Sequence, residues 1–240
     1  MLGRFLEYSL ATPDIRESLE FYVKLGFSPA EVGEAWAHPY AVVTDGRIYL
    51  GLHQEPIHAP SLTFVKPGLL KHAEVLEQMG IEFEFRRLGS NVFNELGWFD
   101  PSGELVRLIE ARTFSPSKRL DTNTSKCGYF LEIALPTPSR EAATAYWEQF
   151  GFVGIEETDD RLPHVSCTSD YLDLGLYDPA HLRRPMLRFE VDDVGGTLAR
   201  LAETGISPAG EIPRPLRPLP AAVLTAPEGT SILLSEGTAR

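Results

Sequence analysis

The stretch LEYSLATPDIRESLEFYVKLGF (residues 6–27) returns later in the chain as LEIALPTPSREAATAYWEQFGF (residues 131–152). Each copy has a glutamate in its second position, Glu7 in the first and Glu132 in the second. Further segments repeat in the same order: YLGLH (49–53) as DLGLY (173–177), SLTFV (61–65) as MLRFEV (186–191), and DPSGELVRLIE (100–110) as APEGTSILLSE (226–236). Matched segments in a constant order indicate an internal duplication.

The duplication divides the chain of 240 residues into a first module, residues 1–113, and a second module, residues 127–240. The intervening stretch TFSPSKRLDTNTSK is polar and rich in turn-forming residues, which predicts a linker over residues 114–126.

Each module shows a strand, a helix and several short strands, and this pattern runs twice. Residues 5–11 have the composition of a strand, and the following helix is expected to start at Asp14, where Glu17 completes a capping box, and to end at Gly26. Residues 61–65 begin the second pass. The pattern predicts an α+β fold with two βαβββ units in each module. PRPLRPLP (213–220) is expected to be a rigid connection, because proline cannot donate to a central strand.

The charge balance argues against several classes of partner. The chain has 22 basic and 34 acidic residues, a net charge of −12, and no basic cluster, so neither nucleic acid nor an anionic membrane is an expected partner. No apolar run is long enough to span a bilayer and the N-terminus lacks an export signal, which predicts a soluble, cytoplasmic protein. Cys127 and Cys167 are expected to be free thiols.

Three segments carry a family resemblance. TPDIRESLEFYVKLGF resembles the first helix of the glyoxalase/bleomycin-resistance/extradiol-dioxygenase family, the vicinal oxygen chelate proteins, FEVDDVGGTLARLAETGI resembles its middle strand and helix, and FDPSGELVRLIE resembles its closing strand. The resemblance covers nearly the whole chain. It implies two tandem cup-shaped modules, each a curved mixed sheet whose concave face holds a ligand.

The resemblance also implies positions for metal ligands on the concave face. In this chain those positions hold Glu7, Ser61 and Arg107 in the first module, and Glu132, Met186 and Leu233 in the second. Only the glutamates can bind a metal, and an arginine repels one. We therefore expect no metal ligands and no cofactor, with a divalent ion such as Fe, Mn, Ni or Zn as the alternative. An incomplete metal site formed by Glu132 and Asp173 is a further alternative.

The histidines do not occupy these positions either. They are expected to be loop or surface residues: His38, His53, His58, His72, His164 and His181.

The two glutamates have three interpretations. Glu7 forms a salt bridge with Arg107 that only fixes the cup, or both form the polar base of a ligand pocket, in which Arg107 binds a carboxylate or phenolate. Alternatively, a desolvated Glu7 or Glu132 is a catalytic general base. Since Leu233 replaces the arginine in the second module, Arg188 is the candidate partner of Glu132.

Aromatic residues suggest a planar ligand. The candidate ligand-binding residues of the first module are Arg107, Tyr49, His53, Trp36, Phe93 and Trp98. Those of the second module are Asp173, Tyr177 and Arg188. The first module is the better equipped for binding, and the second has the pattern of a structural copy.

These observations favour a protein that binds a hydrophobic or aromatic small molecule without a catalytic metal. The alternative is an enzyme of the same superfamily, a dioxygenase, isomerase or lyase, that uses a metal or a glutamate base. A third option is a module whose ligand only stabilises the fold. Pairing of the chain into a homodimer is left open.

Overall fold

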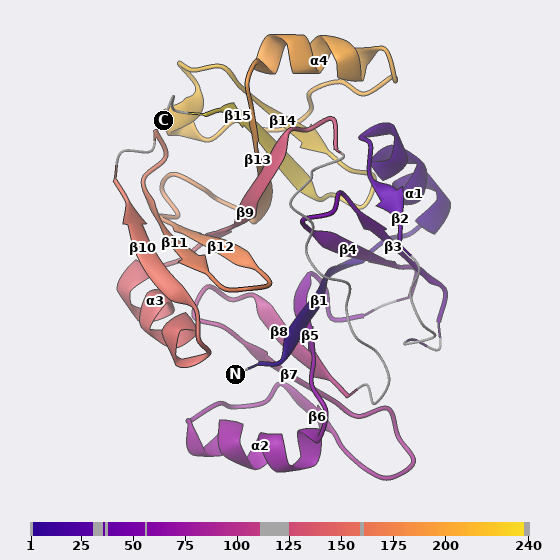
Figure 1. The fold of residues 1–240 in the computed structure, drawn as a ribbon, viewed down its shortest axis with the longest axis vertical. Helices are drawn as coiled ribbons and strands as arrows, with labels where there is room; N and C mark the ends of the chain where they lie inside the picture. Colours follow the sequence, from indigo (N-terminus) through magenta and orange to yellow (C-terminus); the bar gives the residue numbers. More distant parts are fainter. Residues whose placement is uncertain are drawn as a thin grey trace.

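The computed structural model describes residues 2–30, 36, 38–55, 57–110, 125–158 and 161–237. Both repeated modules are present, each built on one mixed sheet (Figure 1). Most of the predicted linker and the end of the first module lie outside the described residues.

The first module contains β1 (Arg4–Ala11), α1 (Ile15–Lys24), β2 (Ser28–Pro29), β3 (Tyr40–Thr44), β4 (Tyr49–His53), β5 (Ser61–Val65), α2 (Leu69–Gln78), β6 (Phe85–Arg87), β7 (Glu95–Phe99) and β8 (Leu105–Ile109). Its strands lie in the order β2-β3-β4-β1-β5-β8-β7-β6. β1 runs parallel to β4 and antiparallel to β5, and β5 runs parallel to β8. The predicted α+β class is confirmed.

The second module contains β9 (Tyr129–Pro136), α3 (Arg140–Gln149), β10 (Val153–Glu157), β11 (His164–Thr168), β12 (Asp173–Tyr177), β13 (Met186–Val191), α4 (Val194–Ala202), a 3-10 turn η1 (Arg214–Leu216), β14 (Ala221–Thr225) and β15 (Ser231–Glu236). Its strand order, β10-β11-β12-β9-β13-β15-β14, repeats that of the first module without the last strand. The proline-rich segment takes that strand's place in the chain, so within the described residues the fourth unit is shorter than the predicted βαβββ.

The predicted start of α1 is confirmed at Asp14. Its carboxylate accepts hydrogen bonds from the backbone N–H groups of Arg16 and Glu17, at 2.8 and 3.2 Å, and so satisfies two of the donors that a helix start leaves unpaired. Gly26 follows the helix with a φ of 90°, a conformation that favours glycine.

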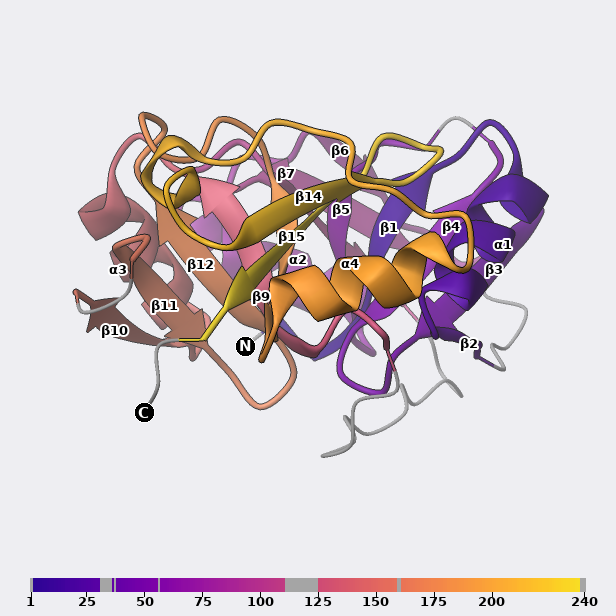
Figure 2. The same ribbon diagram turned by 90° about the horizontal axis from the view of Figure 1, so that it is seen from above.

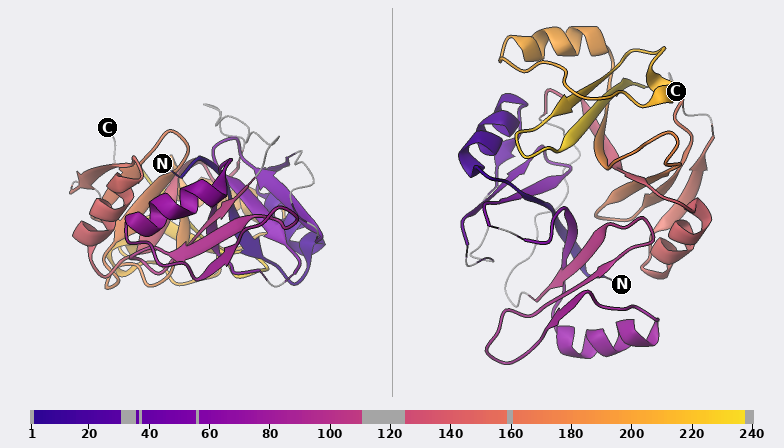
Figure 3. Two further views of the ribbon diagram at one scale, coloured as in Figure 1. Left: turned by 90° about the horizontal axis from the view of Figure 1, so that it is seen from below. Right: turned by 180° about the vertical axis from the view of Figure 1, so that it is seen from behind.

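The two modules pack crosswise. The helices lie at the rim of the molecule, with α1 beside the β14–β15 end of the second module and α3 beside β7 of the first (Figures 1 and 3). Tyr22 of α1 donates to Glu228 at 2.6 Å, and Trp98 of β7 donates to Tyr146 of α3 at 2.6 Å. One apolar cluster includes residues of both modules. The view from above shows α3 at one end of the molecule and α1 at the other, with the strands between them (Figure 2).

None of the helices within the described residues is long and apolar enough to cross a membrane. Cys127 and Cys167 are both buried free thiols, as predicted.

Candidate binding cavity in the first module

A cavity of about 450 Å³ opens on the first module. We call it the first-module cavity. Its walls combine aromatic rings with charged groups, and its lining residues include Trp36, His38, His58, Phe85, Phe93, Glu95 and Arg107. Apolar walls with a few polar groups are typical of small-molecule sites.

Arg107 of β8 is the buried cation of this cavity, with 3% of its surface exposed. Its Nε lies 3.9 Å from a Glu95 carboxylate oxygen, and its Nη2 donates to the His58 carbonyl at 3.4 Å. Within the described residues, Nε and Nη1 have no hydrogen-bond partner. Burial lowers the pKa of Arg107, and the Glu95 and Glu7 carboxylates oppose this. The guanidinium thus has unused donors toward an electron-rich group.

Aromatic rings surround this guanidinium. Its central carbon lies 5.3 Å from the centre of the Trp36 ring and 5.5 Å from that of Phe85. The Trp36 ring also packs against Phe93, 5.4 Å away. The predicted ligand-binding residues Trp36, Phe93 and Arg107 are therefore together at one cavity.

Glu7 lies on the same sheet floor as Arg107, because both residues are in register with Thr63 on the intervening strand β5. Their expected salt bridge is not the contact that forms. The Glu7 carboxylate instead interacts with His53 Nε2 at 2.8 Å and accepts from the Ser9 hydroxyl at 2.8 Å. The floor next to Glu7 is therefore a network of neutral hydroxyls and a histidine, and Arg107 pairs with Glu95.

A histidine chain links Glu7 to the cavity. His53 Nδ1 lies 2.8 Å from His38 Nε2, and His38 lines the cavity. His53 is fully buried on β4, so the expectation of a loop or surface position is wrong for this residue. It is wrong for His164 as well, which is buried on β11. Both histidines can be buried for the same reason, because a buried carboxylate beside each ring supplies the polar partner that a buried imidazole needs.

In the second module, Glu132 lies in a closed polar cluster. It interacts with Arg188 at 3.4 Å and His164 at 3.3 Å, and accepts a hydrogen bond from Tyr177. Burial alone would raise the pKa of Glu132, but the hydrogen bond from His164 and the charges of His164 and Arg188 outweigh burial and lower it. The predicted pairing of Glu132 with Arg188 is confirmed.

The second cup contains a cluster of apolar side chains. Met186 and Leu233, at two of the family's metal positions, belong to a buried cluster that also contains Leu162, Leu182, Leu216 and Val223. A cavity of about 350 Å³ lies beside this cluster, lined by Met186 together with Arg183, Arg184 and Glu211. The second module therefore has a cavity of its own, but Leu233, at the position of Arg107, is packed among apolar side chains and does not line it.

A histidine and a tyrosine occupy swapped positions in equivalent strand pairs of the two modules. Tyr40 and His53 are paired across β3 and β4, whereas His164 and Tyr177 are paired across β11 and β12. The rings stack in both cases, at 5.3 and 4.5 Å between centres. This exchange is visible when the two repeats are aligned, and it was the sequence signal that could have located both buried histidines.

Six predicted ligand-binding residues do not line the first-module cavity: Tyr49, His53, Trp98, Asp173, Tyr177 and Arg188. His53 reaches it only through His38, and Tyr177 and Arg188 belong to the Glu132 cluster. Trp98 is buried in the packing between modules, where its indole N–H donates to Tyr146. Tyr49 lies at the far end of β4 from His53. Asp173, on β12, accepts a hydrogen bond from Thr168 in the adjacent strand β11. Residues that sequence reasoning did not select are His38, His58, Phe85 and Glu95.

The residues at the family's metal positions do not suit a divalent ion. In the first module, Arg107 is a buried cation without a lone pair, and Ser61 offers one hydroxyl. In the second, Met186 and Leu233 are packed in the apolar cluster. Among the described residues, no group of three or more His, Cys, Asp and Glu side chains is placed to hold a metal ion.

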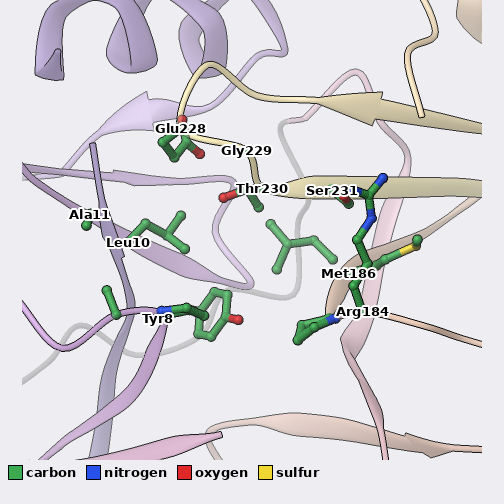
Figure 4. Close-up of a pocket in the computed structure, with 13 residues that line it drawn as sticks. Tyr8, Leu10, Ala11, Arg184, Met186, Glu228, Gly229, Thr230 and Ser231 are labelled. Carbon is green, nitrogen blue, oxygen red and sulfur yellow. The ribbon is translucent and has the colours of Figure 1, made fainter. Parts of the chain in front are cut away.

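A smaller cavity of about 260 Å³ lies between the modules (Figure 4). Tyr8 and Leu10 of β1 face it from one side, and Met186 of β13 from another. Its carboxylate, Glu228, accepts hydrogen bonds from Ser18 and Tyr22. We call this cavity the seam between the modules. It has fewer available polar groups than the first-module cavity.

No protein-family model matches the sequence, and no curated protein matches it. Solved structures do match. A catechol 2,3-dioxygenase is 16% identical, with a TM-score of 0.54 over 99% of this chain and 89% of that chain. Homoprotocatechuate 2,3-dioxygenase from Arthrobacter globiformis is 17% identical, with a TM-score of 0.58 over 98% and 80%. A variant of the enzyme from Brevibacterium fuscum is 16% identical, with a TM-score of 0.59 over 98% and 72%.

These structures are extradiol dioxygenases, which are members of the vicinal oxygen chelate superfamily. The duplicated mixed sheets and the full-length structural match together establish that the chain has the tandem two-module fold of the vicinal oxygen chelate superfamily.

Proposed function

We propose that the first-module cavity binds a planar small molecule with an anionic group, without a resident metal. The main evidence is the state of Arg107. Its side chain is 3% exposed, and its guanidinium has hydrogen-bond donors without partners among the described residues. A buried charge is costly unless it is paired, and a ligand carboxylate or phenolate would complete this pairing.

The aromatic walls select the shape of the ligand. The Trp36 and Phe85 rings lie on the guanidinium, and Phe93 extends this surface at the rim, where 42% of its own surface is exposed. A flat ring system can stack on these side chains while its anionic group reaches Arg107. A carboxylate-bearing bicyclic aromatic molecule, such as 2-naphthoate, is therefore a suitable probe.

Isothermal titration calorimetry tests this proposal. We expect 2-naphthoate to bind at least about tenfold more tightly than neutral 2-naphthamide, because only the carboxylate forms charge-assisted hydrogen bonds with Arg107. Arg107→Met should abolish this difference. The free energy of unfolding should change by less than about 1 kcal/mol or rise, since the buried guanidinium is incompletely paired.

Arg188→Met is the matched control in the second module. It should leave 2-naphthoate binding intact but lower stability, because Arg188 contacts Glu132 and donates to Tyr177 at 2.6 Å. Equal binding of the acid and the amide would contradict the proposal. Loss of stability in Arg107→Met with unchanged binding would show instead that Arg107 is structural.

The metal-free part of the proposal has its own test. Affinity for 2-naphthoate should be the same in protein treated with a chelator and in protein supplied with Fe²⁺ or Mn²⁺. A stoichiometric ion whose removal abolishes binding, and which Glu7→Gln or Glu132→Gln releases, would overturn it.

The second candidate function is an enzyme of this superfamily. The structural neighbours named as dioxygenases favour it through the fold alone, and the chain of His38, His53 and Glu7 at the cavity favours it through chemistry.

A further inference from the structure

We propose that His38 is a general base in the first-module cavity, positioned by His53 and Glu7, and that Arg107 stabilises the anion which its action creates. This inference rests on the proposed binding site and adds a reaction class to it, namely proton abstraction from a planar ligand.

The hydrogen-bond chain defines the tautomers. We assign the proton of the contact between Glu7 and His53 to His53 Nε2, 2.8 Å from the carboxylate, because a carboxylate offers only acceptors. In a neutral His53 ring, Nδ1 then accepts from His38 Nε2–H, 2.8 Å away. The remaining lone pair of His38 is on its Nδ1. The chain therefore leaves the outermost histidine with the basic nitrogen.

Burial follows the same direction along the chain. Glu7 and His53 are at most 1% exposed, whereas His38 is partly exposed and lines the cavity. Glu7 itself is therefore placed to act through His53, as a positioning residue, and His38 is the member that can reach a ligand. The sequence-based hypothesis of Glu7 as the base is replaced in this proposal by His38.

The surroundings of His38 favour its neutral form. Burial and the nearby His53 lower its pKa, and Arg107 contributes in the same direction, while Glu55 and Glu7 oppose them. A neutral imidazole is the form that accepts a proton. The Trp36 ring lies 5.4 Å from the His38 ring centre and 5.3 Å from the Arg107 guanidinium carbon, so both groups are its neighbours. A ligand stacked at Trp36 would therefore meet both groups.

The chemical step is a balanced proton transfer. The Nδ1 lone pair of His38 takes a proton from a C–H or O–H group of the ligand, and the bonding electrons stay on the ligand as an enolate, phenolate or similar anion. The positive charge that forms on His38 is shared with His53 through their hydrogen bond and stabilised by the Glu7 carboxylate. Arg107 donates to the new anion.

In the part of the second module that the structure describes, the equivalent histidine is not linked to a second histidine. His164 Nδ1 lies 2.9 Å from the Leu162 carbonyl, to which it can only donate, and its Nε2 faces the Glu132 carboxylate. Both nitrogens are thus engaged with acceptors, which suits an imidazolium. Burial lowers the pKa of His164, but the hydrogen bond and the charge of Glu132 outweigh burial and raise it above its usual value. Among the described residues of this module, His164 therefore does not provide a comparable base.

The base-promoted elimination of 5-nitrobenzisoxazole tests the proposal without knowledge of the natural ligand. A base removes the ring C–H proton, the N–O bond breaks, a nitrile forms, and the product is the coloured 2-cyano-4-nitrophenolate. We expect saturable catalysis by the full chain. His38→Gln should lower kcat at least about tenfold, while binding of 2-naphthoate stays within about twofold, and added imidazole should partly restore the rate of His38→Ala.

Two further variants separate base, positioning and structure. Glu7→Gln should lower kcat with little change in KM or in 2-naphthoate affinity, because the amide no longer fixes the His53 tautomer. His181→Gln, a histidine outside the cavity, should match the wild type. Unchanged kcat in His38→Gln, or no elimination above buffer, would overturn this inference. If 2-naphthoate still binds in an Arg107-dependent manner, the proposed binding function survives that outcome.

Discussion

Gly51 and Gly175 lie directly against the carboxyl groups of Glu7 and Glu132. A Cβ atom at Gly51 would be 2.2 Å from the Glu7 carboxyl carbon, and one at Gly175 would be 2.4 Å from that of Glu132. Each glutamate therefore crosses the neighbouring strand over a residue that has no side chain. The repeated Leu-Gly-Leu of the two modules is needed for this passage.

At this scale we predict that Gly51→Ala lowers the free energy of unfolding by about 1 to 3 kcal/mol. The new methyl group must displace a buried carboxylate that is hydrogen-bonded to His53 and Ser9. Urea unfolding measures the effect.

Gly195→Ala is the control, since its Cβ would meet no atom closer than 3.4 Å and alanine favours the first turn of α4. The control should be neutral or stabilising. Equal stability of Gly51→Ala and the wild type would show that the Glu7 carboxylate is not held in this position.

Sequence reasoning at the residue scale succeeded where a feature is local or repeated. The repeat selected Glu7 and Glu132, and the family resemblance selected Arg107. Arg188 was selected because it lies two residues beyond Met186 on the same strand. Sequence reasoning failed for His38, because the contact with His53 depends on how β3 and β4 pair.

At the scale of elements, the 3-10 turn η1 closes the second cup. Leu216 ends this turn, is 2% exposed, and packs with Met186 and Leu233 in the second apolar cluster. The prolines around it exclude a regular strand, as the sequence predicted, but its insertion into the core depends on tertiary packing that proline content does not encode.

We predict that Leu216→Ala destabilises the protein by about 2 to 4 kcal/mol, because it leaves a cavity in a packed interior. Leu70→Ala, at a position that is 60% exposed on α2, should cost less than about 0.5 kcal/mol. Guanidinium unfolding of both variants provides the comparison. Similar small losses would indicate that η1 is only loosely seated on the second cup.

At the scale of the whole molecule, two buried acids lie in the turn by which the first module meets α3. Asp100 accepts a hydrogen bond from Trp147 at 3.2 Å, and burial raises its pKa to about 6. Burial, with the charge of Asp100, raises the pKa of Glu104 to about 7. Both acids are therefore harder to ionise in the folded chain than in the unfolded one.

This arrangement predicts a pH dependence of stability. Since the folded pKa of Glu104 exceeds the ordinary value of 4.5, the penalty on the folded chain grows as the pH rises from that value to about 7, and is constant above it. The free energy of unfolding should therefore fall less in Glu104→Gln than in the wild type between about pH 5 and about pH 8. The difference should be on the order of 2 kcal/mol.

The matched variant Glu74→Gln changes an exposed acid on α2 and should keep the slope of the wild type. Urea unfolding at several pH values gives both slopes. If the slope of Glu104→Gln equals that of the wild type, Glu104 does not ionise in this range.

The duplicated architecture could be predicted from the sequence because repeats and periodicity are properties of the chain itself. The crosswise packing of α1 and α3 on the opposite modules could not, since it depends on long-range contacts such as Tyr22 with Glu228. The same holds for the difference between the two cups, since Arg107 lines a cavity in the first whereas Leu233 is packed among apolar side chains in the second.

The central claim is that Arg107 binds the anionic group of a planar ligand in the first module. A crystal structure of the full chain soaked with 6-bromo-2-naphthoate tests it most directly, because the anomalous signal of bromine fixes the orientation of the ring. We expect density in the first-module cavity, with the carboxylate on Arg107 and the ring on Trp36. Bromine located only at the seam between the modules, or a carboxylate directed away from Arg107, would contradict it.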